Sequence, residues 1–184
     1  GREKDLIIRS GHNIDPAAIE EVANAHPAVT MSAAVGMPDE YAGEVPVLFV
    51  VKAPGTDLDM VDLENYMVQH IAEPPAKPKK IFEIEELPTT TVGKIFKPSL
   101  RELAVQEKTR QILSKYVGQG TFSDLTTDTL KDGTTNVTVV INLGKVGINK
   151  QETEAAINNA FIDLPIKLKI KWNNCSALIF SVQY

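Results

Sequence analysis

Residues 6–20 read LIIRSGHNIDPAAIE. Two short apolar runs flank the polar segment Ser10–Asn13, in which glycine and asparagine both tolerate the positive φ of a tight turn. Residues 6–14 are therefore predicted to form a β-hairpin. Asp15 is a good N-cap residue and Pro16 suits the first position of a helix, so a helix is predicted from Pro16 to about Ala25. A tight hairpin that leads directly into a capped helix is thus the first structural unit predicted.

The remaining elements are predicted from apolar periodicity and from turn residues. Strands are expected at 29–35, 45–51 and 81–84, and helices at 59–71 and from about Pro98. Residues 114–135 are rich in Gly, Ser, Thr and Asp, which is typical of a linker or a long loop. A strand at 136–143, a helix at 150–162 and strands at 166–172 and 177–182 follow. We therefore expect a first domain at 1–108, a linker at 109–135 and a second small α/β unit at 136–184.

Composition limits the class of protein. The 184 residues are 43% apolar and 23% charged, as in ordinary globular proteins. A net charge of -5 argues against a nucleic-acid partner. The single cysteine, Cys175, has no internal disulfide partner, and the three histidines show no metal-ligand spacing with it. Because the single cysteine cannot form an internal disulfide, a reduced, cytoplasmic setting is expected. No apolar run reaches the roughly 18–20 residues of a membrane helix.

Two motifs lie at the ends of the first domain. The chain opens with GREKD at 1–5, and PTTTVGKI at 88–95 is followed by Leu100 and Arg101. Together with the hairpin at 6–14, these motifs resemble the C-terminal domain of acyl-adenylate-forming enzymes, most of all that of acyl-CoA synthetases. The resemblance covers about residues 1–105. It implies an α+β domain built from a hairpin, a sheet of about three strands and packed helices.

The resemblance also implies roles for particular residues. Lys94 would be the catalytic lysine of adenylation, Lys4 the hinge residue, and Arg2 a contact of the adenylate ribose. The loop of Ser10, Gly11 and His12 would face CoA, with Gly11 leaving room for pantetheine. Relatives often carry arginine where this chain has Asn13, so a CoA-phosphate contact is not carried over to that position.

The resemblance further implies ATP or AMP, Mg²⁺ and CoA as ligands of a full-length enzyme, and no metal ligands in this chain. The large N-terminal ligase domain that forms the acyl pocket is missing from the sequence, so this chain alone is expected to be inactive and to hold no cofactor. Fatty acid and CoA are the expected substrates, although acyl chain length is not readable from these residues.

The chemistry explains why a lysine is needed at position 94. When a carboxylate attacks the α-phosphate of ATP, negative charge gathers on the phosphoryl oxygens and on the departing pyrophosphate. A positioned cation stabilises that transition state, and a lysine can deliver its charge from a loop on a flexible stem. A nucleotide P-loop is excluded, because its pattern needs glycine where Pro88 stands.

Several alternatives remain open at this point. The parent enzyme could load a carrier protein instead of CoA, although residues 118–121 (GQGT) lack the serine of a carrier attachment site. Residues 110–184 could form a non-catalytic binding or oligomerisation module. Two groups of lysines are interpreted without a binding role. The first group forms a solvated loop and consists of Lys77, Lys79 and Lys80. The second group forms the polar face of an edge strand that blocks unwanted pairing, and it consists of Lys167, Lys169 and Lys171.

Overall fold

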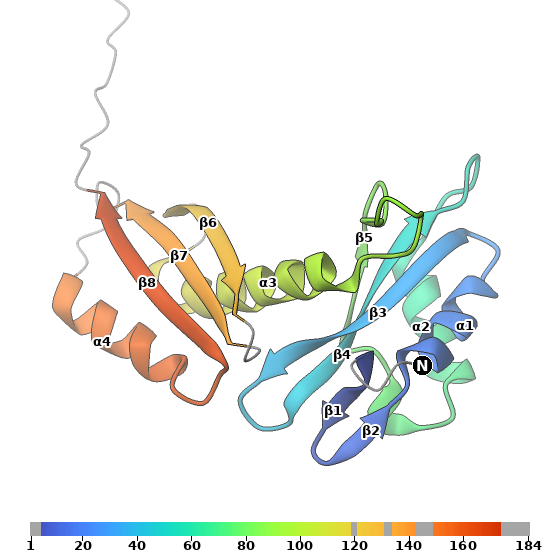
Figure 1. Cartoon of the computed structure of the whole chain (residues 1–184), viewed down its shortest axis with the longest axis horizontal. Coiled ribbons are helices and arrows are strands. Elements are labelled where there is room, and N and C mark those ends of the chain that lie inside the picture. The colour runs from blue at the N-terminus through green and yellow to red at the C-terminus, as the bar shows by residue number, and fades with distance from the viewer. Residues whose placement is uncertain (1–4, 119–120, 131–133, 143–148, 174–184) are drawn as a thin grey trace, which may run out of the picture. The chain divides into compact units, whose positions relative to one another are not determined.

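The computed structural model describes residues 5–118, 121–130, 134–142 and 149–173. The chain divides into two compact units, Gly1–Ala104 and Val105–Tyr184 (Figure 1). The strand expected at 177–182 lies outside the described residues, as do Cys175 and the hinge candidates Arg2 and Lys4. The mixture of helices and two small sheets confirms the predicted α+β class.

The first unit begins with the predicted hairpin and helix, and its later elements follow the predicted order. Its elements are β1 (Ile7–Arg9), β2 (His12–Ile14), α1 (Pro16–Asn24), β3 (Val29–Asp39), β4 (Gly43–Lys52), α2 (Met60–His70), the short 3-10 helix η2 (Pro74–Ala76) and β5 (Lys80–Glu83). The part of the long helix α3 (Lys97–Val117) up to Ala104 completes it. Asp15 and Asp59 cap α1 and α2 with their side chains, as predicted.

The sheet of the first unit has five strands, which are the three predicted strands β3, β4 and β5 and the two strands of the hairpin. Its order is β2-β1-β4-β3, and β5 pairs in parallel with β4 over Val47–Val50. The hairpin joins the sheet because Arg9 of β1 pairs with Gly43 at the start of β4. Strand β4 therefore pairs with β3 along one side. On its other side it pairs first with β1, at Gly43, and then with β5, over Val47–Val50.

Both faces of this sheet are buried, which explains the near-continuous apolar runs of β3 and β4. Helices α1 and α2 cover one face, where Ile19, Leu63 and Met67 pack against Leu48 and the side chains around it. On the other face, Leu100 and Ala104 of α3 pack with Leu87 against Val35, Val47 and Phe49. The sheet thus lies between two apolar layers, one of which contains the start of α3.

One ion pair closes the edge of the sheet. Lys97 Nζ lies 2.7 Å from Glu20 Oε1, and the two side chains are 16% and 19% exposed. Glu20 Oε1 also accepts a hydrogen bond from the N–H of Ala34 at 2.8 Å, while Lys97 Nζ donates to the C=O of Ala34 at 3.3 Å. Since β3 is the last strand of the sheet, these side chains satisfy backbone groups that no further strand pairs. The pair joins α1, the edge of β3 and the first residue of α3.

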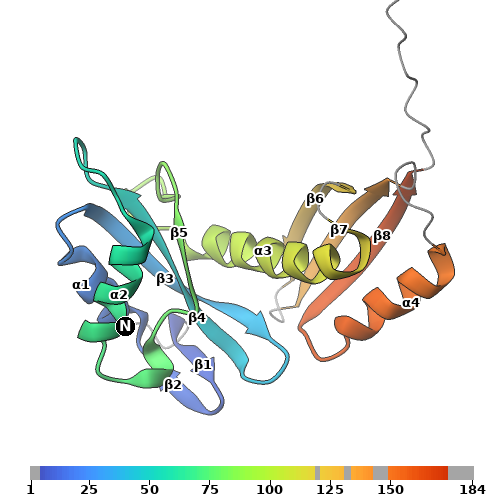
Figure 2. The same ribbon diagram turned by 180° about the vertical axis from the view of Figure 1, so that it is seen from behind.

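The second unit is a three-stranded sheet with two helices. It contains the rest of α3, β6 (Phe122–Thr129), β7 (Thr135–Asn142), α4 (Lys150–Ala160) and β8 (Ile166–Asn173). The strand order is β6-β7-β8, with β6 antiparallel and β8 parallel to β7. Helix α3 crosses one face of this sheet, behind the strands in Figure 1 and in front of them in Figure 2. The core of the second unit includes Leu113, Val139, Ile157 and Phe161.

The expected linker at 109–135 is wrong. Helix α3 continues to Val117, and β6 occupies Phe122–Thr129. Strand β6 carries mostly exposed Ser, Thr and Asp side chains and has a bulge between Ser123 and Thr126, so its sequence looks like a loop.

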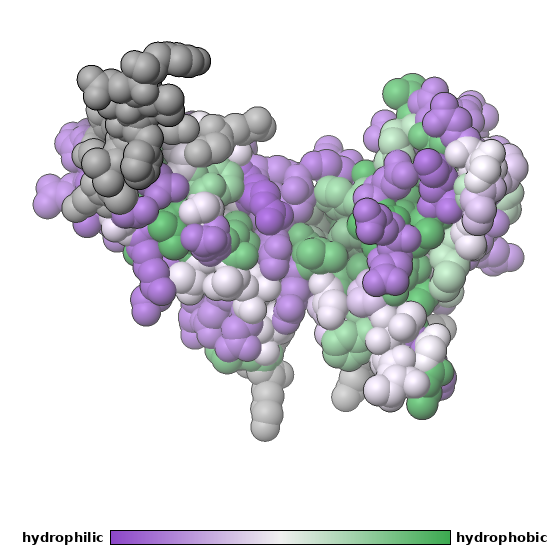
Figure 3. Space-filling view, turned by 90° about the horizontal axis from the view of Figure 1, so that it is seen from above, coloured by the Kyte–Doolittle hydropathy of each residue, from purple (hydrophilic) through white to green (hydrophobic). Residues whose placement is uncertain are grey.

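Among the described residues, no helix is long and apolar enough to cross a membrane. Hydrophilic and hydrophobic side chains are interspersed on the surface seen in Figure 3.

The Glu20–Lys97 pair is expected to contribute measurably to the stability of the first unit. Lys97→Met leaves a half-buried carboxylate and the carbonyl of Ala34 without their donor, which should lower the free energy of unfolding by roughly 1–3 kcal/mol. Glu20→Gln keeps an acceptor for the N–H of Ala34 and should cost less. Urea unfolding of both single variants and of the double variant, followed by circular dichroism, measures the coupling between the two side chains. Additive losses would show that the pair does not act as a unit.

Asp15 is expected to make the stability depend on pH. The hydrogen bond from the N–H of Ala17 lowers the pKa of Asp15 below its ordinary value. Its stabilising effect is then present above the unfolded pKa of about 3.9 and is lost as the pH falls through the lower folded pKa. Asp15→Ala should cost about 1 kcal/mol at neutral pH and less once the carboxylate is protonated in the folded state. Asp15→Asn keeps a cap that does not titrate, so the comparison of the two variants across pH isolates the carboxylate.

Candidate functional site

Lys94 lies in a tight hairpin loop between β5 and α3. Thr90 C=O accepts from Gly93 N–H at 2.9 Å, Thr90 N–H donates to Lys94 C=O at 2.7 Å, and Thr89 pairs with Ile95. Gly93 has a φ of +76°, the left-handed conformation that commonly ends a three-residue hairpin loop. The glycine before the lysine is therefore required by the turn, and the turn fixes where the lysine backbone lies.

The side chain of Lys94 is free within the part of the chain that the structure describes. The residue is exposed, and only its backbone takes part in hydrogen bonds there, including one from its N–H to Thr90 Oγ1 at 3.2 Å. Val92, which is 76% exposed, lies two residues before it. The loop thus presents an uncommitted ammonium group on an ordered backbone.

Both ends of this loop are anchored in the first unit. Leu87 before it is buried in the core with Leu100, and Phe96 N–H donates to Pro88 C=O at 2.7 Å. Three residues after Lys94, Lys97 is held by Glu20 and by the edge of β3. This anchor was not predicted from the sequence, because Glu20 and Lys97 are 77 positions apart.

The second candidate, the hairpin tip at Ser10 and Gly11, also has a fixed geometry. Both residues have positive φ, +48° and +83°, as in a two-residue type I′ turn that closes the pair Arg9–His12. A Cβ on Gly11 would meet no atom within 4 Å. Glycine is thus needed here for its backbone conformation, and the space around it is open.

Three contacts attach this hairpin to the rest of the first unit. Ser10 N–H donates to Ala42 C=O at 2.8 Å, Ile8 N–H donates to Glu44 Oε2 at 3.0 Å, and Arg9 Nη1 donates to Pro75 C=O at 2.8 Å. They place the tip beside η2, where a shallow pocket of about 280 Å³ is lined by Arg9, Ser10, His12, Pro74 and Pro75. His12 was expected in the loop, but it is the first residue of β2, where its side chain is exposed.

The two loops lie far from each other in the first unit. In both Figure 1 and Figure 2, the turn between β1 and β2 is at one end of the unit, and the segment between β5 and α3 is at the other. The structure therefore does not bring Lys94 and Gly11 into one site. It places them on two separate surfaces of the same compact body.

The N-terminal candidates Arg2 and Lys4 lie outside the described residues. Directly after them, Asp5 Oδ1 accepts from Arg101 Nη2 at 3.0 Å, with both side chains about one-third exposed. This pair attaches the first described residue to α3. The sequence contains part of this signal, since Arg101 follows the motif at 88–95 together with Leu100.

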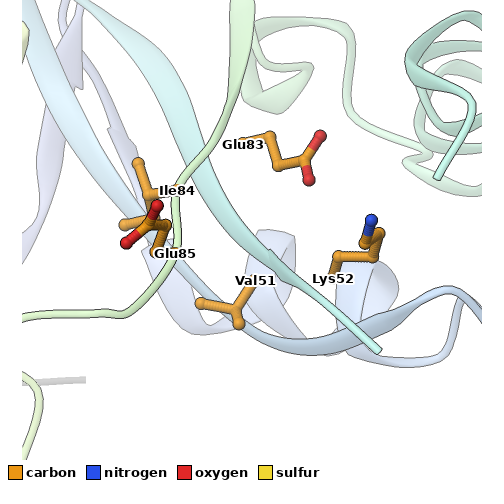
Figure 4. A pocket seen from close by; sticks show the side chains of 5 residues that line it. All are labelled: Val51, Lys52, Glu83, Ile84 and Glu85. Carbon is orange, nitrogen blue, oxygen red and sulfur yellow. The ribbon is translucent and has the colours of Figure 1, made fainter. Parts of the chain in front are cut away.

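A further pocket shows no catalytic arrangement. It has a volume of about 520 Å³ and lies at the ends of β4 and β5, where Val51, Lys52, Glu83, Ile84 and Glu85 line it (Figure 4). None of these residues pairs a nucleophile with a base, as covalent catalysis would require. Within the described ranges, no group of three or more His, Cys, Asp or Glu side chains is placed to hold a metal ion.

Comparison with known proteins identifies the first unit. Residues 18–94 match the AMP-binding enzyme C-terminal domain, and the match ends at Lys94. Marinolic acid–CoA ligase of Pseudoalteromonas sp. (strain SANK 73390) is 39% identical over 172 residues, which are 94% of this chain and 25% of that protein. Acetyl-coenzyme A synthetase of Streptomyces coelicolor is 39% identical over 107 residues, 56% of this chain and 16% of that protein.

Solved structures agree with this result. Apo MatB from Rhodopseudomonas palustris has a TM-score of 0.53 and 36% identity, over 56% of this chain and 20% of that one. The Mycobacterium tuberculosis fatty acyl CoA synthetase has a TM-score of 0.51 and 36% identity, and the match covers 55% of this chain and 20% of that one. The first unit of this chain belongs to the AMP-binding enzyme C-terminal domain family. The chain spans a quarter or less of the length of the relatives it matches.

The second unit is not particular to this chain. The match to marinolic acid–CoA ligase covers 172 residues, whereas the first unit has only 104, so it extends well into the second unit. The other relatives and structures reported above cover little more than half of the chain.

Gly11 is expected to tolerate asparagine better than alanine. Alanine in the left-handed conformation costs roughly 1–2 kcal/mol, whereas asparagine adopts it more readily, and the Cβ of either residue would meet no atom within 4 Å. Urea unfolding should therefore rank wild type, Gly11→Asn and Gly11→Ala in decreasing order of stability. Equal stability of the alanine variant and the wild type would show that the turn does not need this φ.

Proposed function

We propose that the first unit is the mobile C-terminal domain of an ATP-dependent acyl-CoA synthetase. The enzyme would join a carboxylic acid to AMP with release of pyrophosphate, and CoA would then displace AMP to give the thioester. The observation that carries this proposal is the anchored loop of Lys94, whose ammonium group is uncommitted in the described structure. Its position in a domain of the AMP-binding family supports the same conclusion.

In the first half-reaction, Lys94 would stabilise charge on the phosphoryl oxygens of the acyl-adenylate. Such a group is most effective when it is held in place, and the turn at Gly93 together with the anchor at Lys97 supports this role by fixing the backbone of Lys94. ATP would be the nucleotide substrate and AMP its product. Mg²⁺ would be bound by the nucleotide and by the rest of the enzyme.

In the second half-reaction, the hairpin tip would face the same active site. Gly11 presents no side chain and has open space around it, so an extended pantetheine arm could pass close to the backbone. Ser10 and His12 flank this position as exposed polar residues. Because the two loops lie on separate surfaces, a rotation of the domain is needed to exchange them.

We propose Lys4 as the hinge of that rotation and Arg2 as a contact of the adenylate ribose. The ion pair of Asp5 with Arg101 supports the hinge assignment, because it attaches the residue directly after Lys4 to the rigid body of the domain. An N-terminal ligase domain would be the partner that supplies the acyl pocket. Fatty acid and CoA would be the substrates, and the cytoplasm the setting.

The main alternative is an adenylation enzyme that loads a carrier protein. The relatives and structures reported above include a marinolic acid–CoA ligase, an acetyl-coenzyme A synthetase and a fatty acyl CoA synthetase, which favours CoA as the acceptor. For the second unit, we propose a non-catalytic role, with the domain boundary at the change of core between Ala104 and Val105.

The role of Lys94 can be tested in a chimera in which this chain replaces the matching quarter of marinolic acid–CoA ligase. Lys94→Ala should lower ATP–pyrophosphate exchange with marinolic acid by roughly 100-fold or more, because a positioned charge is lost from the transition state. Thioester formation from supplied acyl-AMP should change little. Lys52→Ala, which removes an exposed lysine of the same unit, is the matched control and should leave both rates unchanged.

Equal loss in both half-reactions for Lys94→Ala would contradict the division of roles. This chain alone, without the remaining three quarters of the ligase, should give no exchange. Exchange catalysed by the isolated chain would contradict the dependence on a separate ligase domain.

A further inference from the structure

Among the described residues of the second unit, helices cover one face of the sheet and leave the other face open. Leu168, Ile170 and Trp172 of β8 are partly buried and pack against the core that α3 and α4 complete. Because side chains alternate along a strand, Lys167, Lys169 and Lys171 lie on the opposite face. All three lysines are exposed, whereas their neighbours in β7 are half-buried.

The pairing register defines the residues of this open face, which we call the lysine face. Each lysine heads a row that crosses the three strands. The rows are Lys167–Asn136–Asp128, Lys169–Thr138–Thr126 and Lys171–Val140–Ser123. Apart from Val140, the residues of these rows are polar. Asp128 is the carboxylate in the rows and lies two strands away from Lys167, and a second carboxylate, that of Asp124 in the β6 bulge, accepts a hydrogen bond from Ser123 Oγ at 3.3 Å.

The three ammonium groups are not used by the fold. Within the described ranges, none of them makes an ion pair or a hydrogen bond. They follow one another at intervals of about 7 Å along β8, so they repel one another. A charged residue on an edge strand can block unwanted pairing, but a row of three aligned cations in a chain of net charge -5 exceeds that need.

We propose that the lysine face is a docking surface for an acidic helix of a partner protein. Carboxylates on every fourth residue of a helix repeat at about 6 Å, which is close to the repeat of lysines along β8. The hydroxyl and amide groups of β7 and β6 would offer further hydrogen bonds beside the row. The surface is complementary in charge and in spacing to such a helix.

The geometry favours a helix over other anionic ligands. The lysines are spread along a line on a flat sheet, whereas a single nucleotide or phosphate needs donors that converge on one point. A nucleic acid normally requires a larger basic excess, and here Asp128 lies on the same face. The proposal does not depend on the catalytic role of the first unit, although the second unit also accompanies a CoA ligase in a relative.

The test uses the full chain and a synthetic helical peptide of about 20 residues with glutamate at every fourth position. Binding is followed by NMR chemical-shift changes of backbone amides and by the fluorescence of Trp172, the only tryptophan, which adjoins Lys171. We expect shifts concentrated on β7 and β8, and affinity that falls as salt is added. The same peptide with glutamine in place of glutamate should not bind.

The variant Lys167→Gln/Lys169→Gln/Lys171→Gln should weaken binding by roughly tenfold or more, since three exposed ion pairs are lost together. Lys52→Gln/Lys79→Gln/Lys115→Gln removes the same charge from exposed positions elsewhere and is the matched control, with little expected change. Circular dichroism of both variants checks that they fold.

Three results would overturn the proposal. They are equal weakening by the two triple variants, shifts that lie outside the second sheet, and no binding at about 1 mM peptide. A single-stranded oligonucleotide is titrated in parallel. If it binds the lysine face more tightly than the acidic peptide, the surface serves nucleic acid, and the assignment to an acidic helix is wrong.

Discussion

The structure of the first unit depends on how the edge of its sheet is closed. Strand β3 has no further strand beside it, and the N–H and C=O of Ala34 are satisfied there by Glu20 and Lys97. Because Glu20 belongs to α1 and Lys97 begins α3, the same contact joins two helices to one edge. The edge is thereby protected from pairing with another chain. The position of α3, and of the loop before it, follows from this contact.

The two candidate loops combine a fixed base with a free tip. Glycine supplies a positive φ in each, at Gly93 and Gly11, so the turn geometry is set by backbone conformation. The base of each loop is then held by contacts to distant parts of the chain, Glu20 for one and Ala42 for the other. This arrangement lets one small domain offer a cation from one surface and an open backbone from another. Charge stabilisation and thiol access would then not compete for the same space.

Local signals in the sequence predicted most of the first unit. The turn glycine Gly11 and the caps at Asp15 and Asp59 act within a few residues, so they are readable without a structure. The second positive φ of the turn falls at Ser10, whereas Asn13, which was expected to tolerate it, lies in β2. The contacts of Glu20 with Lys97 and of Asp5 with Arg101 join positions 77 and 96 apart, which no local pattern reveals. Strand β6 was missed because its exposed Ser, Thr and Asp residues resemble a loop. The position of Lys94 came from a motif, while its proposed role came from family resemblance.

The central claim is that Lys94 enters the active site of a larger ligase during adenylation. The most direct measurement is a crystal structure of the marinolic acid–CoA ligase chimera with a bound, non-hydrolysable acyl-adenylate analogue. The account predicts Lys94 Nζ within hydrogen-bonding distance, about 3 Å, of the oxygens at the acyl-phosphate junction. The Glu20–Lys97 contact should be intact in the same crystal. A structure in which the site is closed around the analogue by another lysine, with Lys94 in solvent, would contradict the account.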